Sequence, residues 1–250
     1  SDDNDPVTIE FYIKTCLNEE CLGTILSYTS VKTFTVRNYY GKLKITFGDF
    51  EHQTDLQLKD NVYTQVALVF DGIDYLTVYV DDCHGDLKRE FITLPQYGVH
   101  PFSGTGNVVL GKWLPAPDGS GIQPLNEKFK GCIDVLRLWK RYFVELEIAT
   151  HCNRLYSSKD ENLIKLFNFD DLNTDGMTID TIEGAILRGP TDPFKKPTVE
   201  ISSAPMPFKL STVTIEESQR RRKRQAIISI DITGMCSGIF SSTNSFIRAC

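Results

Sequence analysis

The sequence predicts an all-β fold: a sandwich of two antiparallel sheets with one short helical segment and an irregular C-terminal tail. Short runs of alternating apolar and polar residues recur along the chain, separated by glycine, aspartate and asparagine. Only one segment, near 144–156, has a helical pattern, which disfavours an α/β fold. With 250 residues, 41% of them hydrophobic, the chain can bury a full core, and sandwiches of this length are commonly one domain.

The first clear hairpin lies between residues 33 and 47. Residues 33–37 and 42–47 both alternate, and the apolar side chains of 42–47 share one face. Residues 38–41 read Asn-Tyr-Tyr-Gly, a composition typical of turns. We therefore expect two antiparallel strands joined at this turn.

A second hairpin is expected between residues 65 and 80. The run 65–70 is apolar, and 76–80 alternates as a half-buried strand does. Asp71 and Gly72 open the connection, and the glycine supplies the positive φ that a tight turn demands.

Three further segments complete the expected sandwich. Residues 104–112 form a short apolar run between glycines, and 129–139 form an apolar-rich strand that leads into the helical segment. Residues 163–169 are apolar and precede a loop rich in aspartate. By pattern alone, any two-sheet sandwich accommodates these segments.

The segment 130–148 resembles the closing strand of laminin G-like domains, which are concanavalin A-like and pentraxin-like jelly rolls. The residues in register are Phe129, Gly131, Ile133, Asp134, Val135, Arg137, Trp139, Glu147 and Ile148. The other segments described above follow in the family's order. Asp81 takes the family's aspartate position, whereas Asp82 stands where the family usually has glycine. The resemblance covers roughly residues 6–190 and implies an antiparallel jelly roll.

The chain divides by composition into three parts. We expect a laminin G-like sandwich at 1–190, a proline-containing linker at 191–224 that ends in a basic cleavage-like site, and a tail or the start of a further segment at 225–250. The sequence has no run of about 20 apolar residues, so no membrane span is expected.

The charge balance limits the classes of partner. The chain has 27 basic and 33 acidic residues and a formal net charge of −6. An acidic body lacks the extended basic face that displaces counterions from phosphates, so no nucleic acid partner is expected. This balance is compatible with divalent cations, mineral surfaces or basic partners.

Seven cysteines are spread along the chain, and none forms a Cys-x-x-Cys pair. Zinc sites need close paired ligands, so disulfides are the better interpretation and indicate a secreted, extracellular protein. The expected pairs are Cys16 with Cys21, Cys132 with Cys152, and Cys236 with Cys250. Cys83 is then left over, either free and buried or paired between chains. The alternative is a cytosolic protein with seven reduced cysteines.

A basic run occupies residues 220–224, Arg-Arg-Arg-Lys-Arg. It resembles the cleavage signal of furin-like proprotein convertases, with Arg221, Lys223 and Arg224 at the matching positions and the cut between Arg224 and Gln225. An acidic protease cleft binds several such cations at once. A nuclear-localisation or heparin-type patch and a solvated charged loop are the alternatives.

Catalytic motifs are absent from the sequence. The four histidines lie in four different segments, and neither a Gly-x-Ser-x-Gly elbow nor a His-Glu-x-x-His helix is present. The paired-carboxylate strand motif of concanavalin A-like glycosidases is also missing. We therefore expect no enzyme; a diverged carbohydrate hydrolase is the enzymatic alternative. Each lone histidine is expected at the surface.

Two groups of residues are candidates for binding. The resemblance raises the prospect of Ca²⁺ at a loop rim, with Asp170, Asp171 and Asp175 as candidate ligands, although aspartates in loops more often form turns. No other cofactor is expected. Exposed aromatic residues could stack on sugar rings, while Trp139 is expected at an inward, core position. These aromatic candidates are Tyr39, Tyr40, Trp113 and Tyr142.

The function expected from these observations is a secreted, non-enzymatic adhesion or extracellular-matrix module that binds a glycan or a matrix protein through its loop rims. The alternative is an acidic structural component of an extracellular or mineralised matrix, such as a skeleton or shell.

Overall fold

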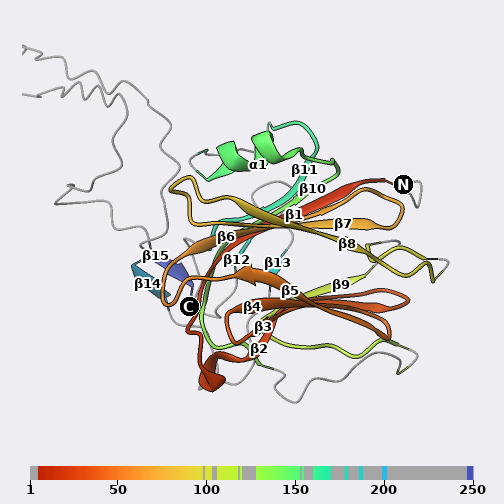
Figure 1. Ribbon diagram of the computed structural model, residues 1–250, viewed down its shortest axis with the longest axis horizontal. Helices are drawn as coiled ribbons and strands as arrows, with labels where there is room; N and C mark the ends of the chain where they lie inside the picture. Colours follow the sequence, from red (N-terminus) through yellow and green to blue (C-terminus); the bar gives the residue numbers. More distant parts are fainter. Residues whose placement is uncertain are drawn as a thin grey trace, which may run out of the picture.

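The computed structural model describes the chain at 5–97, 99–102, 106–117, 119, 128–152, 154 and 160–169, with four short strands at 178–179, 186–187, 199–201 and 247–249. Two stacked antiparallel sheets form the body, and one short helix lies on the outer face of one sheet (Figure 1). This is the all-β jelly-roll sandwich that the sequence predicts. No helix within these ranges is both long and apolar enough to cross a bilayer.

The larger sheet has the strand order β11-β10-β1-β6-β7-β8, and all its neighbouring strands are antiparallel. The strands are β1 (Val7–Lys14), β6 (Thr64–Phe70), β7 (Tyr75–Asp81), β8 (Lys88–Thr93), β10 (Cys132–Trp139) and β11 (Leu163–Phe167). The predicted hairpin at 65–80 is β6–β7, with Gly72 at a φ of +91° in its turn. The first strand and the predicted closing strand, β1 and β10, pair directly.

The smaller sheet has the order β5-β4-β3-β2-β9 and is also antiparallel. Its strands are β2 (Gly23–Thr29), β3 (Thr33–Tyr39), β4 (Lys42–Phe47), β5 (Phe50–Gln57) and β9 (Asn107–Leu110). The predicted hairpin at 33–47 is β3–β4. Its turn places Tyr40 and Gly41 at φ values of 54° and 79°, a conformation that suits primed hairpin turns.

The main core fills the space between the sheets. Alternation along each strand points every second side chain inward, so β1 contributes Ile9, Phe11 and Ile13 to this core. The other strands add further inward residues, among them Val36, Leu43, Ile45, Phe47, Val66, Leu68, Leu76, Val78 and Leu136.

A second apolar cluster covers the outer face of the larger sheet beneath the helix α1 (Glu145–His151). Ile148 of α1 packs there with Tyr12, Val69 and Trp139. Trp139 is therefore buried, but the expectation that it points into the inter-sheet core is wrong. Because α1 lies over the sheet (Figure 1), an outward strand position becomes a buried one.

The remaining described elements are short. The helix α1 is shorter than the helical segment predicted at 144–156, and a 3-10 helix, η1, spans Glu19–Cys21. Four short strands form two separate pairs: β12 (Thr178–Ile179) with β13 (Ile186–Leu187), and β14 (Val199–Ile201) with β15 (Ile247–Ala249). The last pair joins the predicted linker to the end of the chain.

Candidate functional site

One end of the sandwich carries both disulfides that join described cysteines. Strand register defines this end: Lys14 lies opposite Cys132, and Gln65 lies opposite Asp81. Cys16 follows β1 and the loop that contains Cys83 follows β7 at the same end. We call this end the disulfide rim. It consists of residues 15–22, 38–42, 57–62 and 81–83.

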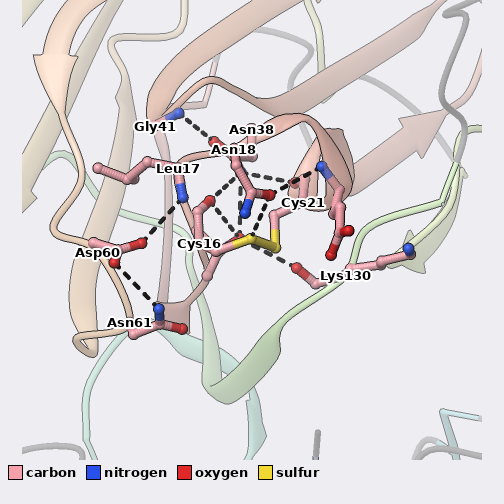
Figure 2. The surroundings of a disulfide bond; sticks show 11 residues. Cys16, Leu17, Asn18, Cys21, Asn38, Gly41, Asp60, Asn61 and Lys130 are labelled. Carbon is pink, nitrogen blue, oxygen red and sulfur yellow. Dashed lines mark hydrogen bonds between the residues drawn. A yellow bond between two sulfur atoms is a disulfide. The ribbon is translucent and has the colours of Figure 1, made fainter.

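A disulfide joins Cys16 to Cys21, the pair expected from the sequence, and closes a compact loop that includes η1. The buried Asn38 fixes this loop to the sheet (Figure 2). Its amide nitrogen donates to Thr15 Oγ1 at 3.2 Å and to the carbonyl oxygens of Cys16 and Cys21 at 3.2 and 2.8 Å. Its amide oxygen accepts from the Gly41 N–H at 2.9 Å. One side chain thus holds both the disulfide loop and the β3–β4 turn.

A second group of bonds attaches the loop to the start of β6. The carboxylate of Asp60 accepts from the Leu17 N–H at 3.2 Å (Figure 2). The Asn61 N–H donates to the Thr15 carbonyl oxygen at 2.9 Å. The Thr15 hydroxyl also donates to the carbonyl oxygen of Lys130 at 3.2 Å. With contacts on three sides, the loop backbone is held in one arrangement.

Two tyrosines lie at the tip of the β3–β4 hairpin. The rings of Tyr39 and Tyr40 meet edge to face with centroids 5.0 Å apart, and the Lys44 ammonium lies 4.4 Å from the Tyr39 centroid. Tyr40 is 44% exposed, and its hydroxyl donates to Glu19 at 3.3 Å. The tip therefore presents aromatic, cationic and anionic groups together on a fixed backbone.

The other two aromatic candidates lie elsewhere. Trp113 follows β9. The residues on either side of it are bound to the smaller sheet, because Ser27 of β2 donates to the Lys112 carbonyl oxygen and Thr33 of β3 donates to the Leu114 carbonyl oxygen. Tyr142 is 37% exposed and lies just before α1. Of these four aromatic residues, Tyr39 and Tyr40 lie in contact, and they are neighbours in the sequence.

The second disulfide joins Cys83 to Cys152. The predicted bond between Cys132 and Cys152 is therefore wrong, and Cys83 is not left over. The reason is the course of the chain after β10: α1 brings Cys152 over β6 and β7, where its sulfur lies 2.7 Å from Gln65 Oε1 and 3.4 Å from Asp81 Oδ2. Cys132 was chosen as the partner because it is close to Cys152 in the sequence, and that distance does not show where α1 crosses the sheet.

Several predicted site residues lie outside the described residues. These are the cysteines Cys236 and Cys250, the processing residues Arg221, Lys223, Arg224 and Gln225, and the candidate calcium ligands Asp170, Asp171 and Asp175.

Within the described ranges, one group gathers three metal-type ligand atoms: Asp81, Cys83 and Cys152, within 4.8 Å of one another. Its two sulfurs form the disulfide, so only a carboxylate remains and the group does not fit a metal ion. Asp71, an acidic residue of the β6–β7 turn, accepts from three backbone N–H groups, those of Ile73, Asp74 and Tyr75. This carboxylate shapes its turn, as aspartate commonly does.

A buried polar network is centred on Glu10, a residue that the sequence did not single out. Glu10 Oε1 accepts from His151 Nδ1 at 2.7 Å and from Gln65 Nε2 at 3.0 Å, and Oε2 accepts from Trp139 Nε1 at 2.7 Å. Arg137 lies directly opposite Glu10 on the neighbouring strand β10, and its Nη1 is 4.0 Å from Glu10 Oε2. Burial raises the pKa of Glu10, but His151 and Arg137 outweigh this effect and hold the pKa below its ordinary value.

This network cannot act on a substrate, because Glu10 is 0% exposed and His151 is 3% exposed. His151 is thus not the surface residue that the sequence suggested. In the pattern Thr-Ile-Glu-Phe-Tyr of β1, Glu10 occupies an outward position that normally faces solvent. Glu10 is buried because α1 lies over this face of the sheet. The sequence of β1 alone does not show that a helix covers this position.

The comparisons support the fold. No family model and no curated protein matches the sequence. A candidate carbohydrate-binding protein from Bacteroides ovatus matches in structure with a TM-score of 0.52 and 18% identity, over 73% of this chain and 51% of that chain. The present chain thus spans about half of that protein's length.

Two further structural matches have lower TM-scores. One is a heptameric SAP-like pentraxin from Limulus polyphemus, with a TM-score of 0.46 and 16% identity, over 74% of this chain and 79% of the pentraxin chain. The other is the pair of LG4-5 domains of the mouse laminin alpha1 chain, with a TM-score of 0.43 and 15% identity, over 57% of this chain and 37% of the laminin chain. The two stacked antiparallel sheets, together with the match at a TM-score of 0.52, show that the chain has the laminin G-like, concanavalin A-like fold that the resemblance implies.

Proposed function

We propose that this chain is a secreted, non-enzymatic binding module that holds a glycan at the disulfide rim. The observation that carries the proposal is the exposed ring of Tyr40 on a backbone fixed by Asn38 and the Cys16–Cys21 bond. Tyrosine offers an apolar face and a polar hydroxyl, which suits the apolar and hydroxyl-bearing surfaces of a sugar. A fixed backbone reduces the ordering cost of binding.

A binding role fits the chemistry of the described residues better than catalysis. The carboxylate–histidine pair of Glu10 and His151 is closed off beneath α1. In the other such pair, His52 with Glu90, the carboxylate also accepts from the Asp55 N–H, so it bridges β5 and β8. General acid–base catalysis requires the acid or base to lie within hydrogen-bond reach of a substrate.

The proposal includes an extracellular location and proteolytic processing. Disulfides such as Cys16–Cys21 and Cys83–Cys152 are typical of proteins that fold in oxidising compartments. In that setting the basic run at 220–224 is a substrate for a proprotein convertase, with cleavage after Arg224.

A glycan array probed with the intact protein, in Ca²⁺ and in a chelator, tests the function. Tyr40→Ala should weaken binding of the strongest glycan at least about 10-fold, as expected for an aromatic residue at the centre of a contact. The matched control is Tyr75→Ala. Tyr75 is 53% exposed and begins β7 at the opposite end of the sandwich, so its loss should change the Kd less than about 2-fold.

Equal weakening by both substitutions would contradict a site at the disulfide rim. Absence of any saturable glycan binding would instead favour the alternative, an acidic structural component of an extracellular or mineralised matrix. Binding lost in chelator would place Ca²⁺ in the site.

A further inference from the structure

Cys132, the first residue of β10, is itself disulfide-bonded. The four other cysteines in the described ranges pair with one another. The sequence contains seven cysteines, so two remain as partners within the chain: Cys236 and Cys250.

The end of the chain returns to this part of the sandwich. The strand β15 pairs antiparallel with β14, with Ala249 opposite Val199 and Ile247 opposite Ile201. β15 also contacts β10, whose first residue is Cys132. Cys250 is the residue immediately after β15, whereas Cys236 lies 11 positions before Ile247, where β15 begins.

We infer that Cys132 is bonded to Cys250, so that a disulfide fastens the C-terminal end of the chain to the sandwich. The bond forms by thiol–disulfide exchange: the two thiols lose two electrons and two protons to a disulfide of an oxidising thiol catalyst, which leaves as a dithiol. Three bonds then gather at one end of the fold, and Cys236 is left outside them.

This bond decides what processing produces, a consequence that rests on the proposed cleavage after Arg224. Hydrolysis of the Arg224–Gln225 peptide bond consumes one water molecule and creates a new amino terminus. Because the cut lies between Cys132 and Cys250, the piece 225–250 stays attached through the disulfide. The mature molecule is then two chains joined covalently, with β15 still paired to β14.

Peptide mapping of the unreduced protein tests the bond without any convertase treatment. Digestion with a protease that cuts after lysine and arginine, followed by mass spectrometry, should yield residues 131–137 cross-linked to the dipeptide 249–250, a species that separates on reduction. Cys236 falls in a different peptide, 225–248. A cross-link from Cys132 to Cys236 would overturn the inference, as would a free Cys132 thiol.

Treatment with a furin-like convertase tests the consequence. Without reductant, the mass should increase by one water and no fragment should separate; reductant should release 225–250. The variant Cys250→Ser should release the fragment without reductant, while the matched variant Cys236→Ser should retain it. Release from Cys236→Ser, or from the unreduced wild type, would overturn the inference. Failure of the convertase to cut would count against the proposed processing alone, because the peptide map reports the bond independently.

Discussion

Replacement of Glu10 by glutamine removes the charge at the centre of the buried network while keeping the size of the side chain. The carboxylate accepts three hydrogen bonds, from His151, Gln65 and Trp139. A glutamine retains one acceptor oxygen but turns an NH₂ group toward donors on its other side. It also removes the negative charge that lies 4.0 Å from the buried Arg137 guanidinium.

The expected cost follows from these contacts. Breaking a buried charged pair by changing one partner typically destabilises by about 3–5 kcal/mol. We expect Glu10→Gln to lower the free energy of unfolding by an amount in this range, measured by urea denaturation at pH 7 with the disulfides intact. The control is Glu51→Gln: Glu51 forms a surface ion pair with Lys44, and its loss should cost less than about 1 kcal/mol. A loss below about 1 kcal/mol for Glu10→Gln would refute the view that this network stabilises the outer face.

The same substitution changes the acid dependence of stability. The pKa of Glu10 in the folded protein lies below its ordinary value of 4.5, so its contribution is complete above that pH. It is lost as the pH falls through the folded pKa, because protonation then favours the unfolded chain. The pKa of Asp81 is raised by burial and gives the opposite slope. The difference between wild type and Glu10→Gln should therefore shrink as the pH falls below 4.5; a constant difference would contradict the sign.

Two further predictions concern the disulfides and Tyr12. The chain-entropy relation gives a stabilisation of about 4 kcal/mol for Cys83–Cys152, whose cysteines are 69 residues apart, and about 2 kcal/mol for Cys16–Cys21, whose cysteines are 5 apart. Replacing both cysteines of Cys83–Cys152 with alanine should therefore lower the free energy of unfolding in urea more than the same replacement at Cys16–Cys21. The reverse order would contradict the view that the disulfides stabilise the fold by restricting the unfolded chain. Burial raises the pKa of Tyr12 to about 12, and its hydroxyl donates to the Cys152 carbonyl oxygen at 2.9 Å. Stability should fall between pH 10 and about 12 more in the wild type than in Tyr12→Phe, because Tyr28 and Tyr79, whose pKa values burial also raises, remain in both proteins. Thermal unfolding measures this difference, and identical profiles would contradict the assignment.

The parts of the fold that sequence analysis captured are those encoded locally. The hairpins at 33–47 and 65–80 carry their alternation and their turn residues side by side, so their pairing follows from short segments. The pair Cys16–Cys21 is of the same kind, because five positions separate its members.

The features that could not be predicted from the sequence depend on contacts between distant segments. The partner of Cys152 depends on where α1 crosses the larger sheet, and the nearest cysteine along the chain was the wrong choice. The burial of Glu10 depends on the same crossing, since alternation in β1 specifies the face of a residue but not what covers that face. Tyr39 and Tyr40 could be named from the sequence, whereas the rigid support from Asn38 required the fold.

Hydrogen–deuterium exchange with and without the strongest glycan from the array gives the most direct test of the binding surface. We predict slower exchange on binding at the β3–β4 turn, around Tyr40, and in the loop closed by Cys16 and Cys21, with little change at the β6–β7 turn. Protection confined to the β6–β7 turn, around Gly72, would contradict a ligand site at the disulfide rim.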